Sequence, residues 1–153
     1  MSDHADVRYL VPALLAMTML AGCGGETDPA ATPAGRAQAR VTEDLYTGRY
    51  NRAYAALYPA HQRLVQPARF AECAKATTPR GLESLEVLDV FDDAILIPGV
   101  RERKAKAVRV RTTLSTGETE TFVNHEVKVG DRWRWVLNAS AVAAYRAGRC
   151  PGL

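Results

Sequence analysis

The sequence lacks an apolar run long enough to span a lipid bilayer. The run "YLVPALLAMTML", residues 9–20, is followed by the small residues Ala21 and Gly22. Its length of about twelve residues falls short of the roughly twenty that a transmembrane helix needs. A short apolar segment followed by small residues is typical of a secretory signal peptide. We therefore predict that residues 1–22 are a leader rather than a membrane-spanning anchor.

The common short motifs of catalysis are also missing. The sequence contains no glycine-rich phosphate loop, no nucleophile-elbow serine and no CxxC pair, which excludes the chemistries that these motifs carry. Beyond the leader the only histidines are His61 and His125. The His-Glu pair at His125 does not continue as a zinc motif, because the residue four positions later is Val129. The sequence predicts no metal site, no cofactor and no catalytic residue.

Cysteine is scarce, and the first of the three cysteines has a distinctive context. It ends the stretch Leu20-Ala21-Gly22-Cys23, which resembles a bacterial lipobox, where a diacylglycerol is attached to the cysteine before cleavage. This spacing predicts a lipoprotein in which Cys23 is the first mature residue and the lipid attachment site. A cysteine that carries several acyl chains such as palmitate holds a protein on the membrane surface, whereas one chain binds only marginally. The alternatives are an ordinary signal peptide with an incidental cysteine and a short buried helix.

Cys73 and Cys150 remain as a pair if Cys23 carries lipid. In an oxidising compartment the expected state of such a pair is a disulfide, and two buried thiols are the alternative. The bond would join the C-terminus to the helical half of the chain. The predicted location is the extracytoplasmic face of the cell membrane, reached through the lipid anchor.

The stretch after the predicted lipid site is rich in Gly, Ala, Pro and Thr and has no apolar periodicity. We predict a flexible tether over residues 23–36, which leaves residues 37–153 as one small domain. Removing the leader takes away Arg8, Asp3 and Asp6 and raises the net charge from +3 to +4. This mild positive charge fits a protein close to anionic lipid or wall polymer.

The first half of the domain has helical spacing. Val41 and Leu45 lie four residues apart, and apolar residues in the ranges 50–58 and 67–75 recur on one helix face. Pro59 interrupts the second of these helices. This half is therefore predicted to consist of short helices.

The second half predicts a meander of antiparallel strands. Residues 82–99 are dense in Val, Leu and Ile and form one long bent strand or two short ones. The ranges 106–114 and 120–129 alternate between apolar and polar side chains, and residues 132–138 form the last strand. Ser140 is expected to cap a short C-terminal helix. Helices followed by an antiparallel sheet define the α+β fold class.

Two stretches carry a resemblance to a known family. The helical segment "TGRYNRAYAALYPAHQRLV" with the later "ARFAEC", and the closing strand "DRWRWVLN", resemble the NTF2-like, or SnoaL-like, superfamily as it occurs in small actinobacterial lipoproteins. The resemblance covers nearly all of residues 37–153. It implies a cone, in which N-terminal helices pack on a curved antiparallel sheet and leave a pocket. It also implies a homodimer formed through the sheet, because members often dimerise in this way.

His125 is the first candidate for the wall of this pocket. It shares a strand face with Val123, and it could act as a general base if that face lines the cone; a structural histidine is the alternative. Asp92 and Asp93 are neighbours near a strand end, so at most one of them can point into the pocket. A solvated turn is the alternative for this acidic pair.

Three aromatic residues complete the candidate pocket. The hydroxyl groups of Tyr54 and Tyr58 could touch a ligand, and Trp135 could form part of the wall. Aromatic residues at helical spacing more often belong to the core. Both roles therefore stay open for these residues.

The strongest charge feature is the segment 101–111, which carries six basic residues against Glu102 alone. Outside the cell membrane, such a segment fits lipid headgroups or an anionic polymer rather than nucleic acid. A solvated strand edge protected by charge explains it without a partner.

The sequence as a whole predicts a lipid-anchored extracytoplasmic module of the cell envelope that binds and does not catalyse. Its partner would be a small apolar ligand or a cell-envelope protein. The resemblance keeps an enzyme as the alternative, because the superfamily includes isomerases, cyclases and dehydratases, and the fold alone does not assign an activity. In that case His125 or an aspartate would work with a pocket tyrosine in proton transfer.

Overall fold

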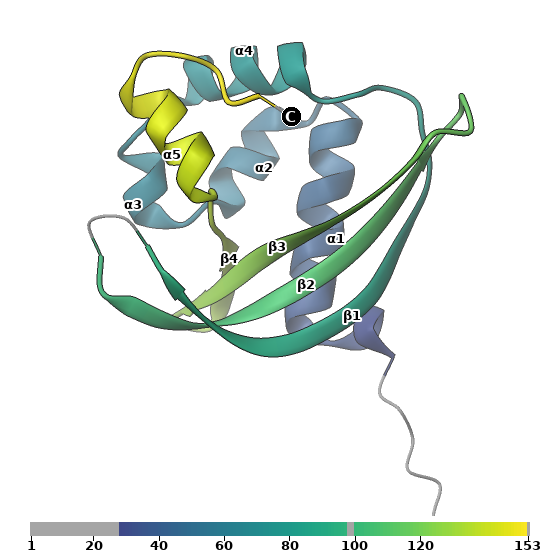
Figure 1. The fold of residues 1–153 in the computed structure, drawn as a ribbon, viewed down its shortest axis with the longest axis horizontal. Coiled ribbons are helices and arrows are strands. Elements are labelled where there is room, and N and C mark those ends of the chain that lie inside the picture. Colours follow the sequence, from purple (N-terminus) through teal and green to yellow (C-terminus); the bar gives the residue numbers. More distant parts are fainter. Residues whose placement is uncertain (1–27, 98–99, 153) are drawn as a thin grey trace, which may run out of the picture.

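The computed structural model describes residues 28–97 and 100–152, in which helices come first, an antiparallel sheet follows and a short helix ends the chain (Figure 1). This order confirms the predicted α+β class. The predicted leader over residues 1–22 and the lipid site at Cys23 lie outside the described residues. Within the described part, no helix is both long and apolar enough to cross a membrane.

Proline begins most of the N-terminal helices, where its missing N–H is not needed. The elements of this half are η1 (Pro29–Ala31), α1 (Pro33–Tyr46), α2 (Tyr50–Ala56), α3 (Pro59–Gln62) and α4 (Pro67–Thr77).

Helix α1 begins earlier than its composition suggests. Thr32 caps it, because its hydroxyl oxygen accepts a hydrogen bond from the N–H of Gly35 at 3.0 Å. Residues 33–36, which the sequence placed in a flexible tether, therefore belong to the folded domain.

The four strands of the described chain form one antiparallel sheet in the order β1-β2-β3-β4. The strands are β1 (Leu82–Leu96), β2 (Glu102–Leu114), β3 (Thr119–Val129) and β4 (Arg132–Trp135). The register of β1 shifts between Val87 and Asp89, and such irregularities bend a strand. Residues 82–96 are therefore one long bent strand, and the sheet is strongly curved (Figure 1).

The C-terminal helix α5 (Ala139–Arg146) is capped by Asn138 and not by Ser140. The side-chain oxygen of Asn138 accepts a hydrogen bond from the N–H of Ala141 at 2.8 Å. The hydroxyl of Ser140 donates to the same oxygen at 2.8 Å. The prediction for Ser140 is thus corrected: the helix begins at Ala139, so the capping position falls on Asn138, two residues before Ser140.

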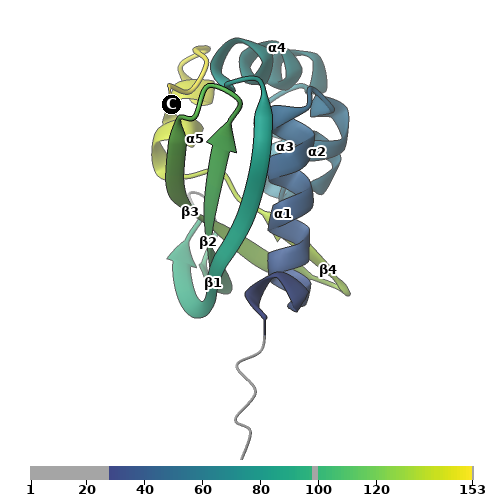
Figure 2. The same cartoon turned by 90° about the vertical axis from the view of Figure 1, so that its right-hand side faces the viewer.

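Each face of the sheet packs against a different segment over part of its area. On one face Val108 and Val110 of β2 pack with Ala34 of α1. On the other face Ala105 packs with Val136, which follows β4. Figure 2 accordingly shows α1 on one side of the strands and α5 on the other.

The main core lies between the helices and the end of the sheet. It includes Leu57, which follows α2, together with Phe70 of α4, Trp135 of β4 and Val142 of α5. A disulfide between Cys73 of α4 and Cys150 closes this end of the domain. The predicted cysteine pairing is therefore confirmed.

Residues 102–111 of the basic segment lie in β2, which is an interior strand, so the explanation of this segment as a protected sheet edge is wrong. Acidic side chains of the neighbouring strand compensate part of its charge. Lys106 Nζ lies 2.8 Å from Asp92 Oδ1, and Arg111 Nη1 lies 3.3 Å from Glu86 Oε2.

Candidate functional site

A cavity of about 380 Å³ lies between the sheet and the segment that leads into α5. The end of β1, the middle of β3 and the chain between β4 and α5 line it. The N–H of Val136 donates to the carbonyl of His125 at 3.1 Å, which keeps this last segment beside β3. The lining residues are 93–97, 123–125 and 136–139.

His125 and Asp93 meet at this cavity. His125 Nε2 lies 2.8 Å from Asp93 Oδ2, although the two residues belong to strands separated by β2. In the register of the sheet, Ala107 pairs with His125 and Ala105 pairs with Asp93. Neighbouring strands lie about 4.8 Å apart, so the two side chains must reach across β2. The methyl groups of the two alanines leave room for them to do so.

The carboxylate of Asp93 is held in its ionised form. The hydrogen bond from His125 lowers the pKa of Asp93, and the N–H of Ala94, which donates to Oδ1 at 2.7 Å, lowers it further. Because a carboxylate only accepts, the N–H at Nε2 of His125 is the donor of this hydrogen bond. The pair thus fixes the orientation of the imidazole ring at the cavity.

Aliphatic residues and two asparagines, Asn124 and Asn138, line much of the rest of the cavity. Ile95, Leu96, Val123 and Val136 contribute aliphatic side chains. Leu96 is 78% exposed and Val123 is 42% exposed, so part of this wall faces solvent. The cavity therefore combines one polar end with an accessible aliphatic wall.

The acidic pair Asp92-Asp93 is divided between the two faces of β1. Asp92 contacts Lys106 and Asp93 contacts His125, so one aspartate of the pair reaches the cavity. Both residues belong to a regular strand and not to a solvated turn.

The three aromatic candidates do not line the cavity beside His125. The hydroxyl of Tyr54 donates to the backbone carbonyl of Gln62 at 2.8 Å. Nε1 of Trp135 donates to the carbonyl of Ala53 at 2.8 Å. Tyr58 is buried in the core beneath β2. The structure thus places these residues in the core, the second of the two roles left open by the sequence.

Sequence reasoning missed Glu126, a buried carboxyl group in β3. Its side chain is fully inaccessible, and neither carboxyl oxygen has a hydrogen-bond partner within the described residues. Burial raises the pKa of Glu126 to about 8, an effect that the nearby charges of Arg40 and Arg134 partly offset. The one available sequence signal for its burial was the alternation of β3. This alternation places Glu126 on the same strand face as the apolar Phe122 and on the opposite face from His125.

His61 has a structural role. It is buried, and its Nδ1 accepts a hydrogen bond from the N–H of Leu137 at 3.0 Å. Burial lowers the pKa of His61, so the ring is neutral and ties α3 to the segment after β4. Across residues 28–97 and 100–152, no three His, Cys, Asp or Glu side chains gather in a way that could hold a metal.

The fold and the cavity define a disulfide-linked α+β domain with a hollow of small-molecule size. Neither the models of known protein families nor the curated proteins include a match to this chain. The functional evidence therefore comes from the cavity and its surroundings.

Proposed function

We propose that this chain is a lipid-anchored extracytoplasmic binding module with an NTF2-like cone, and that it holds a small, mainly apolar ligand in the cavity beside His125. The observation that carries the proposal is that the cavity lining combines hydrogen-bonding groups with aliphatic side chains. The Asp93–His125 pair supplies hydrogen-bonding groups at one end, and Ile95, Leu96 and Val123 supply an accessible aliphatic wall. The volume of about 380 Å³ suits one small molecule.

Two features support the location outside the cytoplasm. The leader pattern ends in the lipobox-like stretch before Cys23. Disulfides persist in oxidising compartments, and the Cys73–Cys150 bond fits such an environment. The lipid at Cys23 would hold the domain on the membrane surface without a spanning helix.

Binding is favoured over catalysis because the His–Asp pair lacks a further reactive group. Among the described residues that line the cavity, none is a tyrosine, lysine, serine, threonine or cysteine. A second proton-transfer group to work with this pair is thus missing from the lining.

The decisive experiment is native mass spectrometry of the lipidated protein taken from its own membrane. We expect a retained small molecule that is lost in Val123→Asp, because the new charge would stand in the aliphatic wall. Val129→Asp is the matched control. Val129 lies in the same strand and is 37% exposed, yet it does not line the cavity. Absence of a ligand from the wild type, or equal retention in both variants, would contradict the proposal.

An enzyme of the SnoaL-like kind is the second candidate, and the 2.8 Å contact between His125 and Asp93 favours it. The recovered molecule can be incubated with the protein and followed by chromatography and mass spectrometry. Conversion to a product that is lost in His125→Gln, while binding persists, would establish the enzyme. An unchanged molecule supports the binding module.

The same spectra test the homodimer that the family resemblance implies. Phe91 and Val123 expose apolar side chains on one sheet face, which would provide contact area. A mass of two chains that Phe91→Asp reduces to one chain supports dimerisation through this face, and a single-chain mass in the wild type contradicts it.

A further inference from the structure

Five arginines gather where α1, α2 and β4 meet, and we refer to them as the arginine face. They line two adjoining hollows of about 320 and 350 Å³, which share Ala37, Arg40 and Trp133. The members of the arginine face are Arg36, Arg40, Arg52, Arg132 and Arg134.

The positive charge of this face is largely uncompensated, because the buried Glu126 near Arg40 and Arg134 has a pKa of about 8 and is mainly neutral. Two carboxylates line the hollows, Asp44 and Asp131. Asp44 is already engaged, because Arg49 donates to it at 2.6 Å, and Arg52 lies 3.7 Å from its other oxygen. Within the described part of the chain, the other four members of the arginine face form no ion pair.

Backbone contacts hold two of these arginines in place. Arg36 donates from Nη1 to the carbonyl of Ala31, and Arg134 donates from Nη1 to the carbonyl of Ala55. Each guanidinium has five N–H donors, so most of them stay available to a ligand. Arg36 and Arg134 thus present oriented donors rather than freely moving side chains.

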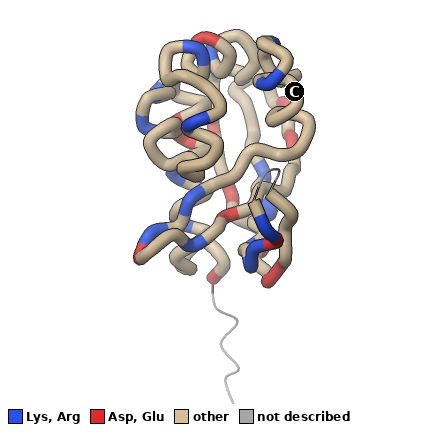
Figure 3. Tube along the Cα trace, turned by 90° about the vertical axis from the view of Figure 1, so that its left-hand side faces the viewer, with Lys and Arg blue, Asp and Glu red and all other residues tan. Residues whose placement is uncertain are grey.

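Part of the arginine face lies at the end of the domain where the described chain begins. The first turn of α1, at Pro33 and Arg36, shares a hollow with Asp131 of the β3–β4 turn and Trp133 of β4. Figure 2 shows η1, the start of α1 and this turn at the lower end of the molecule, and Figure 3 shows blue Lys and Arg segments there among red Asp and Glu segments. Cys23 precedes Asp28 by five residues, which reach at most about 18 Å when fully extended.

We propose that the arginine face docks the anchored domain on anionic phospholipid headgroups. This inference rests on the proposed lipid anchor, since the short reach from Cys23 would hold this end of the domain next to the membrane. The guanidinium fork matches the geometry of phosphate oxygens. Trp133 is partly exposed among the arginines, and tryptophan favours the headgroup level of a bilayer.

The anchor makes headgroups the favoured source of phosphate over a free ligand. A soluble phosphate compound would have to compete with a charged surface within reach of the same arginines. Each basic side chain near such a surface adds attraction that fades within a Debye length. Docking should therefore depend on anionic lipid and weaken with salt.

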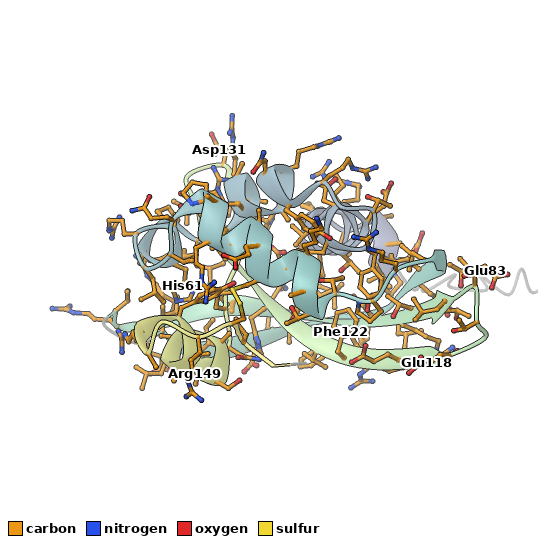
Figure 4. All side chains as sticks on the ribbon, turned by 90° about the horizontal axis from the view of Figure 1, so that it is seen from above. His61, Glu83, Glu118, Phe122, Asp131 and Arg149 are labelled. Carbon is orange, nitrogen blue, oxygen red and sulfur yellow. A yellow bond between two sulfur atoms is a disulfide. The ribbon has the colours of Figure 1, made fainter. Side chains whose placement is uncertain are left out.

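The test uses the mature lipidated protein, purified from its membrane and placed in vesicles. One set contains phosphatidylcholine alone, and the other also contains phosphatidylglycerol. With Cys73 and Cys150 bonded to each other and Cys23 lipidated, an introduced cysteine is the one free thiol and takes a fluorescent label. Asp131→Cys puts the label beside the arginine face, and Glu118→Cys puts it at a distant corner of the sheet (Figure 4).

A lipid with a nitroxide on its headgroup reports the distance from the membrane. We expect the label at position 131 to be quenched more in phosphatidylglycerol vesicles than in phosphatidylcholine vesicles, and the label at 118 to show no such difference. The double variant Arg40→Gln/Arg132→Gln should lose the difference. The matched control Arg63→Gln/Arg80→Gln removes two exposed arginines elsewhere and should keep it.

Equal quenching at both positions in both vesicles would overturn the docking proposal and leave the anchor intact. Quenching that inorganic phosphate removes, and chloride at the same ionic strength does not, would reveal a site for free phosphate and also overturn docking. A Cys23 peptide without lipid in mass spectrometry would instead overturn the anchor, and the docking inference with it.

Discussion

Asp93 shows how one hydrogen bond sets the state of a side chain at the cavity. Its pKa is lowered first by the bond from His125 and then by the N–H of Ala94. Both partners act on the charged form, because a carboxylate accepts from both. Asp93 is well exposed, so its shift is best tested by titration and not through stability.

We predict that His125→Ala raises the pKa of Asp93 toward its ordinary value, because the largest stabilising bond to the carboxylate is lost. The side-chain carboxyl resonance of Asp93, followed by NMR across the acidic range, measures the change. Lys106→Ala is the matched control, since it removes the partner of the neighbouring Asp92. A pKa of Asp93 that stays low in His125→Ala would show that the imidazole does not act on it.

Glu126 is buried at a position where a charged carboxylate is energetically unfavourable. A buried polar group without a partner loses its hydration without compensation. The pKa of about 8 means that the side chain is mainly neutral at neutral pH. Its ordinary value is 4.5, so the folded state binds a proton more tightly than the unfolded state between these two values.

The sign of the pH effect follows directly. Where the folded state holds more protons, stability decreases as pH rises. The contribution of Glu126 is therefore fully present below about pH 4.5 and is lost as pH rises through about 8. His61 acts in the opposite direction, because burial lowers its pKa; its contribution is present above about pH 6.5 and is lost in acid.

We predict that Glu126→Gln removes the loss of stability toward pH 8. At about 1.4 kcal/mol per unit, the free energy of unfolding of the wild type should fall relative to the variant by roughly 3 to 4 kcal/mol between pH 5 and pH 8. Urea denaturation at both pH values measures this, and the effect of His61 cancels because both proteins contain it. Glu118→Gln, at an exposed turn, should follow the wild type. Parallel curves for the wild type and Glu126→Gln would contradict the raised pKa.

At the scale of elements, the start of helix α5 depends on Asn138, the residue directly before the helix. Asn138 lies three residues after the end of β4, and its side chain accepts a hydrogen bond from the N–H of Ala141. Ser140 contacts only the side chain of Asn138 by its hydroxyl. The two residues therefore differ in what they contribute, although either one could serve as a cap by residue type.

We predict that Asn138→Ala lowers the free energy of unfolding by about 1 kcal/mol, because an N–H of the first turn loses its acceptor. Ser140→Ala should lower it by clearly less. Urea denaturation of the two variants side by side decides the matter, and a larger loss for Ser140→Ala would reverse the assignment.

Strand β2 illustrates why elements were easier to predict than their contacts. Its alternation gave the strand and its two faces, and residues 106–114 indeed lie within it. Alternation does not state which strands flank it, so the charged edge was inferred wrongly. The meeting of His125 and Asp93 over Ala105 and Ala107 likewise depends on the register of three strands, which no single strand encodes.

Composition misled in one further place. The segment before α1 is rich in Pro, Gly and Ala, and such composition is typical of linkers. Thr32 and Pro33 nevertheless supply a cap and a first helical residue, so the folded domain reaches to Pro33. Hydrophobic spacing could not reveal this, because the first turns of α1 are held by small residues such as Ala34.

At the scale of the whole molecule, the disulfide links parts that are 77 residues apart in sequence. The double variant Cys73→Ser/Cys150→Ser should lose about 4 kcal/mol of stability, because the unfolded chain regains the freedom that the closed loop removes. Urea denaturation with and without reductant measures the loss. Thiol counting on the denatured, unreduced wild type is the control, and two free thiols there would show that the bond is absent.

The β2–β3 turn, residues 115–118, is fully exposed, and exposed polar turns are common sites of proteolytic cleavage. A cut there would separate Cys73 from Cys150 along the chain, yet the disulfide and the pairing of β2 with β3 would keep the two fragments together. The nicked protein would migrate as one species until it is reduced. A domain cut at this turn by a protease would thus retain its C-terminal helix, and the cavity wall that precedes it, after its backbone had been broken.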